Sequence, residues 1–259
     1  MKTLILAGGL GTRIAEETES KPKPMVLIDE HPILWHIMQI YALQGFNDFV
    51  IALGYKGDII KRWIKDLFEL DGSFTIQMST GNVNNFEKKL SQNFSITALE
   101  TGISSLTGKR IKISMQKIGN ERIFATYGDG LGNINLNELL SQHIKSKKLV
   151  TLTAVRPAAR FGYLEIDQDN SIRHFGEKNQ MDAGWINGGF FVIEPEVAEL
   201  IGNENESFES GLLTRLAGNN LLGAYKHNGF WRPMDTLREK QELSALAEKS
   251  VPDWFENLL

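Results

Sequence analysis

The chain begins with a short apolar run that leads directly into a glycine-rich turn. Residues 4–7 read Leu-Ile-Leu-Ala, and residues 8–13 read Gly-Gly-Leu-Gly-Thr-Arg. Such a run is typical of a strand buried on both faces of a parallel sheet. Because glycine has no Cβ, the turn lets backbone N–H groups approach a ligand, and successive N–H groups form an anion-binding concavity. With the positive charges of Arg13 and Lys23, the pattern predicts an α/β protein with a site for a phosphate ester. We expect that ester to be a nucleoside triphosphate.

The spacing of the glycines excludes two common phosphate-binding loops. No G-x-x-x-x-G-K-[ST] string follows the strand, so the turn is not a P-loop. The dinucleotide fingerprint G-x-G-x-x-G/A also fails, because its third position, counted from Gly9, falls on Ile14. A dehydrogenase is therefore disfavoured. For the loop considered alone, a tight turn without a ligand remains the alternative.

Composition and charge limit the classes of partner. The chain has 259 residues, of which 42% are hydrophobic and 23% charged, as in ordinary globular proteins. Its net charge of −4 gives no reason to expect nucleic acid as a partner. The absence of cysteine excludes disulfides and thiolate metal sites. The N-terminal apolar run is too short for a signal-peptide core or a membrane span. The absence of cysteine fits a cytosolic protein without proving that location, and we expect no membrane partner.

Apolar periodicity alternates between strand and helix along most of the chain. Strands are expected over residues 3–7, 48–53, 74–78, 122–127, 149–155 and 187–193, and helices over residues 33–43, 57–68, 136–145, 208–216 and 237–249. Two further segments, residues 163–166 and 171–175, flank a polar turn and predict a hairpin. The alternation predicts an α/β fold, a three-layer sandwich with a mainly parallel, Rossmann-like mixed sheet. Since no linker divides the chain, we expect a single domain over residues 1–259.

Residues 80–94 interrupt this alternation. The segment is rich in asparagine and has little periodicity. A polar connection of this length is typical of a functional lid, a contact loop or a disordered segment. An ordinary surface excursion is the alternative.

Two aspartates lie where a metal bound to a nucleotide is expected. Asp129 lies between two glycines after the strand predicted at 122–127, and Asp235 lies just before the last predicted helix. Ligands of open α/β sheets bind outside the carboxyl ends of the strands. Mg²⁺ prefers carboxylate oxygens and bridges to substrate phosphates, so one or two aspartates can hold it. The alternatives are a plain turn at Asp129 and, for Asp235 considered alone, a helix N-cap, which is the stronger expectation there.

A second group of polar residues and glycines follows in the C-terminal half. Glu177 and Asn187 offer donors and acceptors for sugar hydroxyls, and Lys178 offers a point charge for a phosphate. Gly162, which precedes Tyr163, lets the backbone approach a small ligand. Separate turn glycines and a surface Glu-Lys pair are the alternative. The order of these residues along the chain favours a site.

Two other enzyme classes lack their motifs. The five histidines show no H-x-x-x-H or H-E-x-x-H spacing, which argues against a zinc enzyme. No G-x-S-x-G string is present, so the nucleophile turn of a serine hydrolase is missing.

Motifs along nearly the whole chain resemble those of the sugar-1-phosphate nucleotidylyltransferases, and among these the glucose-1-phosphate cytidylyltransferase branch. The strings that carry the resemblance are LILAGGLGTR (4–13), KPKPM (21–25), PILWHIM (32–38), GYKG (54–57), TGKR (107–110), YGDG (127–130), RFGYLEI (160–166), INGGFF (186–191) and GFWRPMDTLREK (229–240). The resemblance implies the nucleotide-diphospho-sugar transferase fold. It also implies a reaction of CTP with α-D-glucose 1-phosphate that gives CDP-glucose and pyrophosphate. Mg²⁺ as cofactor, a homo-oligomer, and a cytoplasmic role in making nucleotide-linked deoxysugars for surface polysaccharide follow from the same resemblance.

The resemblance also assigns the candidate residues of the site. Nucleotide-binding residues are Leu6, Gly8, Gly9, Gly11, Thr12, Arg13, Lys23, Arg110 and Gly128, with Arg13 and Lys23 as the catalytic residues and Arg110 at the place of a base-contacting arginine. Sugar-phosphate-binding residues are Gly162, Tyr163, Glu177, Lys178 and Asn187, and the metal ligands are Asp129 and Asp235. The nucleotide part spans residues 1–130 and the sugar-phosphate part residues 131–259. The chain departs from the branch at Lys109, Asn179 and residues 158–159.

We therefore predict a nucleotidyltransferase in which an oxygen of the sugar phosphate attacks the α-phosphorus of the nucleotide in line, and pyrophosphate leaves. Positioning and charge stabilisation supply the catalysis of such a reaction, without a covalent intermediate. The first alternative is the same reaction with UTP, dTTP or another phosphorylated acceptor. The second is a non-catalytic nucleotide-sugar-binding protein, against which the presence of all the charged candidate residues argues.

Overall fold

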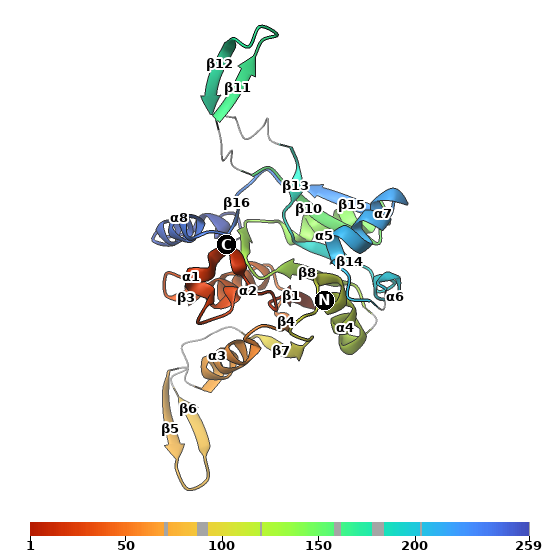
Figure 1. The fold of residues 1–259 in the computed structure, drawn as a ribbon. Helices are drawn as coiled ribbons and strands as arrows, with labels where there is room; N and C mark the ends of the chain where they lie inside the picture. The colour runs from red at the N-terminus through yellow and green to blue at the C-terminus, as the bar shows by residue number, and fades with distance from the viewer. Residues whose placement is uncertain are drawn as a thin grey trace.

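A mixed β-sheet of eight strands forms the centre of the molecule (Figure 1). The computed structural model describes residues 1–69, 72–86, 93–119, 121–157, 162–177, 184–202 and 204–258. The strands of the sheet are β1 (Thr3–Leu6), β4 (Asp48–Leu53), β7 (Ser95–Glu100), β8 (Ile123–Tyr127), β10 (Val150–Val155), β13 (Ile186–Asn187), β14 (Phe191–Ile193) and β15 (Leu222–Lys226). Their order is β13-β10-β14-β8-β1-β4-β7, and β15 pairs with β10.

One half of the sheet is parallel and the other half is mixed. β1 lies between β4 and β8 and runs parallel to both, with Leu4 opposite Val50 and Ala125. β7 extends this half as a parallel strand beside β4. β14 runs antiparallel to β8 and β10, whereas β15 runs parallel to β10. The carboxyl ends of β4, β1 and β8 therefore lie at the same edge of the sheet.

Helices cover both faces of the sheet and make three layers. Along β1, the side chain of Ile5 enters one buried cluster, while those of Leu4 and Leu6 enter another, as expected when successive side chains point to opposite faces. The Ile5 face is covered by α2 (Ile33–Ala42), α3 (Gly57–Glu69), α5 (Leu136–Ser146) and α8 (Leu237–Ala247). The other face is covered by α4 (Thr107–Ile118), α6 (Val197–Leu200), a π-helical segment η4 (Phe208–Leu213) and α7 (Thr214–Gly218). The predicted fold class is confirmed.

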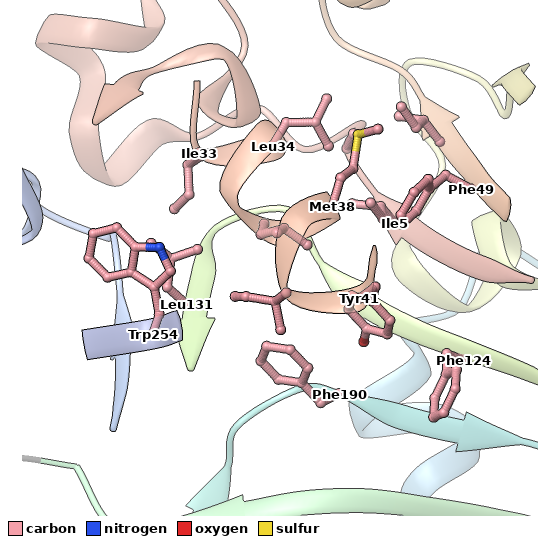
Figure 2. Close-up of a cluster of buried hydrophobic side chains, with 14 of the residues drawn as sticks. Ile5, Ile33, Leu34, Met38, Tyr41, Phe49, Phe124, Leu131, Phe190 and Trp254 are labelled. Carbon is pink, nitrogen blue, oxygen red and sulfur yellow. The ribbon is translucent and has the colours of Figure 1, made fainter. Parts of the chain in front are cut away.

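α2 packs its apolar side chains onto the Ile5 face (Figure 2). Leu34 and Met38 are fully buried, and the ring of Tyr41 stacks on Phe190 with the centroids 5.9 Å apart. Burial of a large apolar side chain of this kind stabilises the fold by about 1.5–3 kcal/mol. The apolar spacing of residues 33–43 predicted this helix, and its packing fixes the layer beneath β1.

Short elements at the carboxyl edge of the sheet bring distant parts of the chain together. Before α2 lie η1 (Thr12–Ile14), α1 (Ala15–Thr18), η2 (Lys23–Met25) and the paired strands β2 (Leu27–Ile28) and β3 (His31–Pro32). β9 (Gly130–Gly132) pairs antiparallel with β16 (Trp231–Pro233), and η5 (Asp253–Phe255) lies near the C-terminus. The β9–β16 pair joins the segment after β8 to the segment before α8.

Two hairpins project from opposite ends of the body (Figure 1). One consists of β5 (Ser73–Gln77) and β6 (Asn82–Phe86), and the other of β11 (Gly162–Ile166) and β12 (Ile172–Glu177). The second hairpin confirms the prediction made for residues 163–166 and 171–175. In the first, the strand predicted at 74–78 lies outside the central sheet.

The structure differs from the predicted elements in several places. Residues 82–86, expected within a polar loop, form a strand, since backbone pairing does not require apolar side chains; residues 87–92 lie outside the described residues. β7 and α4 were not predicted, because β7 is largely exposed and α4 begins with a polar turn. The strand expected over 187–193 is two short strands, because Gly189 and Phe190 have φ angles of 78° and 47°. The helix expected over 208–216 begins as η4 and continues as α7.

Among the described residues, the structure contains no helix whose length and apolar character suffice for crossing a membrane.

Candidate active site

A cavity of about 320 Å³ opens at the carboxyl ends of β1 and β8. This volume is in the range of small-molecule sites. Its walls include every residue predicted for the nucleotide and one of the two predicted metal ligands: Leu6, Gly8, Gly9, Gly11, Thr12, Arg13, Lys23, Arg110, Gly128 and Asp129. Segments separated by about a hundred residues of sequence thus meet in one cavity, at the edge of the sheet where the strand pattern placed them.

The glycine-rich loop is shaped by close contacts that only glycine permits. Gly11 has a φ of 65°, and a Cβ there would lie 2.9 Å from the Cγ2 atom of Thr18. The hydroxyl of Thr18 donates to the carbonyl of Gly11 at 3.0 Å, which fixes this turn. A Cβ on Gly8 would lie 2.2 Å from Nη1 of Arg110, whereas a Cβ on Gly9 would meet no described atom within 4 Å. Gly8 and Gly11 are therefore required by the fold of the loop, and Gly9 leaves space for a ligand.

Arg110 holds the glycine-rich loop against the neighbouring strands. Its side chain is buried, with 3% of the residue exposed, and burial lowers the pKa of its guanidinium. Nη1 donates to the carbonyl of Leu53 (2.9 Å) and to Oγ1 of Thr101 (2.7 Å). Nη2 donates to the carbonyls of Gly8 (2.9 Å) and Ile103 (3.2 Å). These contacts tie together the ends of β1, β4 and β7. A contact of Arg110 with a base stays a prediction.

Lys23 and Arg13 of the cavity wall form a neutral cluster with two carboxylates, Asp129 in the wall and Asp235 beside it. Nζ of Lys23 lies 2.7 Å from Oδ2 of Asp129 and 2.6 Å from Oδ1 of Asp235. Nη1 of Arg13 lies 2.5 Å from Oδ2 of Asp235. The Lys23 side chain is only 8% exposed, whereas that of Arg13 is 70% exposed. A buried ammonium needs such partners, because an unpaired charge in the interior is costly.

The backbone around Lys23 is fixed by two prolines. Pro22 precedes η2 in an extended conformation, and Pro24 lies inside this short helical turn. Because proline restricts φ, the lysine is held in place by its neighbours before any ligand binds. The KPKP string therefore builds a preorganised cation.

Asp235 does not cap α8, so the N-cap expectation for this residue was wrong. The N-cap is Thr236, whose hydroxyl accepts from the N–H of Glu239 at 3.2 Å. Glu239 in return accepts from the N–H groups of Asp235 (2.7 Å) and Thr236 (2.9 Å). The Thr-x-x-Glu spacing is a capping box and was readable in the sequence. Since the box satisfies the helix end, the Asp235 carboxylate is available for Lys23 and Arg13.

The β9–β16 pair brings the two aspartates together. Gly130 is opposite Pro233 in this ladder, and the N–H of Met234 donates to the carbonyl of Asp129 at 2.8 Å. Among the described residues, no group of three or more His, Cys, Asp or Glu side chains could hold a metal ion. The two carboxylates nevertheless surround one cation, the ammonium of Lys23. This arrangement fits a divalent ion that takes its remaining ligands from water and substrate phosphates.

The predicted sugar-phosphate residues are described in part. Gly162 and Glu177 are paired at the base of the β11–β12 hairpin, with Tyr163 next in the strand, and only their backbone is described. Lys178 lies outside the described residues. Asn187 ends β13, where its amide Nδ2 donates to the hydroxyl of Tyr127 at 3.0 Å. The structure therefore places Asn187 directly behind the cavity wall that Tyr127 forms.

Sequence reasoning missed Tyr127, Glu209 and Thr107. The carboxylate of Glu209 accepts from the hydroxyls of Tyr127 at 2.6 Å and Thr107 at 2.7 Å. Tyr127 was visible as the first residue of the Tyr-Gly-Asp-Gly string but had no assigned role. Glu209 lies in a segment read only as helix, so nothing in the sequence distinguished it from a surface glutamate.

Comparisons with known proteins agree with this architecture. Residues 2–236 match the family model described as nucleotidyl transferase. The chain is 43% identical over 255 residues to a glucose-1-phosphate cytidylyltransferase of Salmonella typhi, covering 98% of each chain. It is 40% identical to a probable glucose-1-phosphate cytidylyltransferase of Bacillus subtilis, covering 98% of this chain and 99% of the relative.

A solved structure supports the fold. The crystal structure of HddC from Yersinia pseudotuberculosis superimposes with a TM-score of 0.69 and 23% identity, covering 94% of this chain and 98% of that one. By its sequence match over nearly the whole length, the chain belongs to the nucleotidyl transferase family, in the group that contains the glucose-1-phosphate cytidylyltransferases.

Proposed function

We propose that the protein transfers a cytidylyl group from CTP to α-D-glucose 1-phosphate, giving CDP-glucose and pyrophosphate. The proposal rests on one observation: the glycine-rich loop, Lys23 and Asp129 line one cavity, and Asp235 contacts Lys23 from beside it. Such a combination suits a triphosphate, whose charge needs N–H donors, fixed cations and a metal. The names of these two relatives supply the base and the sugar.

The loop and its cations bind the phosphates in this proposal. The N–H groups of residues 8–12 face the triphosphate, and Leu6 and Gly128 line the cavity beside it. An oxygen of glucose 1-phosphate attacks the α-phosphorus; one P–O bond forms, and the bond to the β-phosphate oxygen breaks. Lys23 and Arg13 stabilise the charge that develops on the α-phosphate and on the departing pyrophosphate.

Asp129 and Asp235 are the residues that would hold Mg²⁺. A bound divalent ion supplies charge neutralisation to the triphosphate. In the structure Asp129 and Asp235 both contact Lys23, and Asp235 also contacts Arg13. The nucleotide phosphates must form ion pairs with Lys23 and Arg13 in their place before the two carboxylates can bind a metal. The nucleotide therefore has to arrive for the metal ligands to become available.

The sugar phosphate is assigned to the C-terminal half. Glu177 and Asn187 offer groups for sugar hydroxyls, Lys178 offers a charge for the phosphate, and Gly162 and Tyr163 lie at the base of the same hairpin. This division gives a nucleotide part over residues 1–130 and a sugar-phosphate part over 131–259 within one domain. We further infer a homo-oligomer in the cytoplasm, without nucleic acid or membrane as a partner. The projecting hairpins support an oligomer, because an isolated two-stranded hairpin is only marginally stable in water.

A matrix of nucleotides and sugar 1-phosphates tests the proposal. Purified protein is incubated with CTP, UTP, dTTP, ATP or GTP and with glucose, mannose or galactose 1-phosphate, and pyrophosphate release is measured with and without Mg²⁺. The highest kcat/KM is expected for CTP with glucose 1-phosphate, and only with Mg²⁺. A higher value for UTP or dTTP would select the first alternative. Binding of CDP-glucose without pyrophosphate release from any pair would select a non-catalytic binding protein.

A further inference from the structure

A half-buried carboxylate behind the cavity connects two parts of the site. Glu209, on η4, accepts hydrogen bonds from the hydroxyls of Tyr127 (2.6 Å), Thr107 (2.7 Å) and Ser207 (2.7 Å). Tyr127 and Thr107 both line the cavity. The hydroxyl of Tyr127 also meets Nδ2 of Asn187 at 3.0 Å. A continuous path of hydrogen bonds therefore runs from the cavity wall to Asn187.

The direction of each hydrogen bond along this path is fixed. Burial alone would raise the pKa of Glu209, but the hydroxyl donors outweigh it and hold that pKa below its ordinary value. The carboxylate is therefore ionised and has no proton to give, so all three hydroxyls donate to it. A tyrosine hydroxyl has one hydrogen. Since that hydrogen points to Glu209, Tyr127 can only accept from Asn187, and the NH₂ group of the amide must face it.

A second contact imposes the same orientation on the Asn187 amide. The backbone N–H of Gly189 donates to Oδ1 of Asn187 at 2.9 Å, so the amide oxygen must face the backbone. A half-turn of the amide would break both contacts. Counting contacts within the described part of the chain, the amide keeps one N–H and one oxygen lone pair for a ligand. A hydroxyl group, which both donates and accepts, is the complement of this pair.

Packing holds the Tyr127 ring in the position that this path requires. A Cβ on Gly189 would lie 3.1 Å from the ring, so glycine is what allows the backbone to pass so close. The ring packs edge-on against Phe191 with centroids 5.5 Å apart, and Phe191 packs against Phe208 at 5.6 Å. Phe208 precedes Glu209 on η4. The hydroxyl and the carboxylate are therefore both presented by rigid elements.

We propose that Glu209 and Tyr127 are positioning residues that orient the Asn187 amide toward a hydroxyl of the sugar phosphate. The inference rests on the proposed function, because it names a partner for Asn187 within the same site. Neither residue acts on the reacting phosphorus. Their effect passes through Asn187, so it falls on the affinity for the sugar phosphate and not on the affinity for the nucleotide.

Steady-state kinetics of Tyr127→Phe and Glu209→Gln tests this assignment. Tyr127→Phe keeps the ring in the cavity wall and removes only the hydroxyl, and Glu209→Gln replaces the acceptor-only carboxylate. Each variant should raise the KM for glucose 1-phosphate about tenfold, as expected for the loss of one positioned hydrogen bond. The KM for CTP and the affinity for CTP in isothermal titration should stay unchanged. The double variant Tyr127→Phe/Asn187→Ala should have the same KM for glucose 1-phosphate as Asn187→Ala alone.

Tyr225→Phe is the matched control. The hydroxyl of Tyr225 also donates to a glutamate, Glu138, at 2.8 Å, but on the surface between α5 and β15. This variant should behave as the wild type. Equal changes in both KM values, no change in either, or additive effects in the double variant would overturn the positioning role. If circular dichroism shows that Tyr127→Phe does not fold, the two KM values of Glu209→Gln test the positioning role instead. A wild type that makes no CDP-glucose would overturn the proposed function itself, whereas an active wild type with unselective variants would overturn only this inference.

Discussion

Among the single residues of the site, Lys23 is the one that links the two carboxylates. It is the cation that contacts both Asp129 and Asp235, while Arg13 contacts Asp235 alone. The prolines on either side hold its backbone, and its own burial leaves it little freedom. A residue fixed in this way stabilises developing charge without reorganising during the reaction.

Lys23→Ala should lower kcat for CDP-glucose formation about 100- to 1,000-fold, the loss typical of one preorganised electrostatic donor. The rate of pyrophosphate release at saturating substrates measures this effect. Lys61→Ala is the control, because Lys61 pairs with Glu100 on the exposed side of β7 and lies outside the cavity. Turnover of Lys23→Ala close to that of the wild type would exclude the catalytic role.

The same variant should change metal binding in the opposite direction. Without nucleotide, Lys23 competes with a divalent ion for Asp129 and Asp235, so the wild type should bind Mn²⁺ weakly. Removal of the ammonium in Lys23→Ala should increase the affinity for Mn²⁺ on the order of tenfold, because a positive charge leaves the site. Electron paramagnetic resonance of free Mn²⁺ measures this affinity. Addition of Asp129→Asn should abolish the gain. Equal Mn²⁺ affinity in wild type and Lys23→Ala would contradict the competition.

At the scale of elements, the site depends on how strand ends are held together. Arg110, from α4, donates to carbonyls at the ends of β1 and β4 and to Thr101 after β7. A Cβ on Gly54 would lie 2.5 Å from its Nη1 atom, so the guanidinium fills the space between two glycines, Gly8 and Gly54. The shape of the glycine-rich loop thus depends on Arg110, which belongs to helix α4 and not to the loop itself.

Arg110→Ala should weaken CTP and UTP binding by similar factors and lower the melting temperature. The carbonyls of Gly8 and Leu53 would each lose the hydrogen bond from Arg110 but keep other donors, the N–H of Tyr55 for Gly8 and Thr101 for Leu53. The cost is therefore that of the lost hydrogen bonds, about 0.5–1.5 kcal/mol each. Isothermal titration and thermal unfolding measure the two effects. Arg62→Ala, at an exposed ion pair with Asp58, serves as the control and should change neither. A loss of CTP binding with retained UTP binding would instead show that Arg110 reads the base.

The sequence predicted the elements that carry strong apolar periodicity and missed those that do not. β1, α2, β4 and β8 are buried and were predicted close to their observed bounds. β7 has one sheet neighbour and is largely exposed, so its pattern carried little signal. The loop residues and Asp129 were predicted from motif chemistry. Glu209 could not be predicted in this way, because its role depends on its hydrogen bonds with Tyr127 and Thr107, which only the fold brings beside it.

Across the whole molecule, the central body and the projecting hairpins differ in how much apolar packing stabilises them. The body has buried clusters on both faces of its sheet, whereas the β5–β6 hairpin projects from it (Figure 1). β6 contains three asparagines in five residues, and such a strand gains little from apolar burial. A contact with a second subunit would give the hairpin the packing that its own chain does not supply.

Deletion of residues 82–92 should therefore affect assembly and nucleotide kinetics together. We expect light scattering to show a closed oligomer for the wild type and a smaller species for the deletion. The KM for CTP should rise more than the KM for glucose 1-phosphate. Deletion of residues 168–170, at the tip of the β11–β12 hairpin, is the control. It removes an exposed turn from the other hairpin. A monomeric wild type with unchanged CTP kinetics in the deletion would show that the segment is an ordinary surface excursion.

Attack by the sugar phosphate on the α-phosphorus can be tested by following the oxygen atoms of the sugar phosphate. Glucose 1-phosphate labelled with ¹⁸O on its phosphate oxygens is incubated with CTP, Mg²⁺ and the protein. The products are separated, and their masses are measured by mass spectrometry. If the sugar phosphate attacks the α-phosphorus of CTP in this cavity, CDP-glucose forms and carries the whole label, while the pyrophosphate carries none. Label in the pyrophosphate, or no CDP-glucose, would contradict attack by the sugar phosphate on the α-phosphorus of CTP.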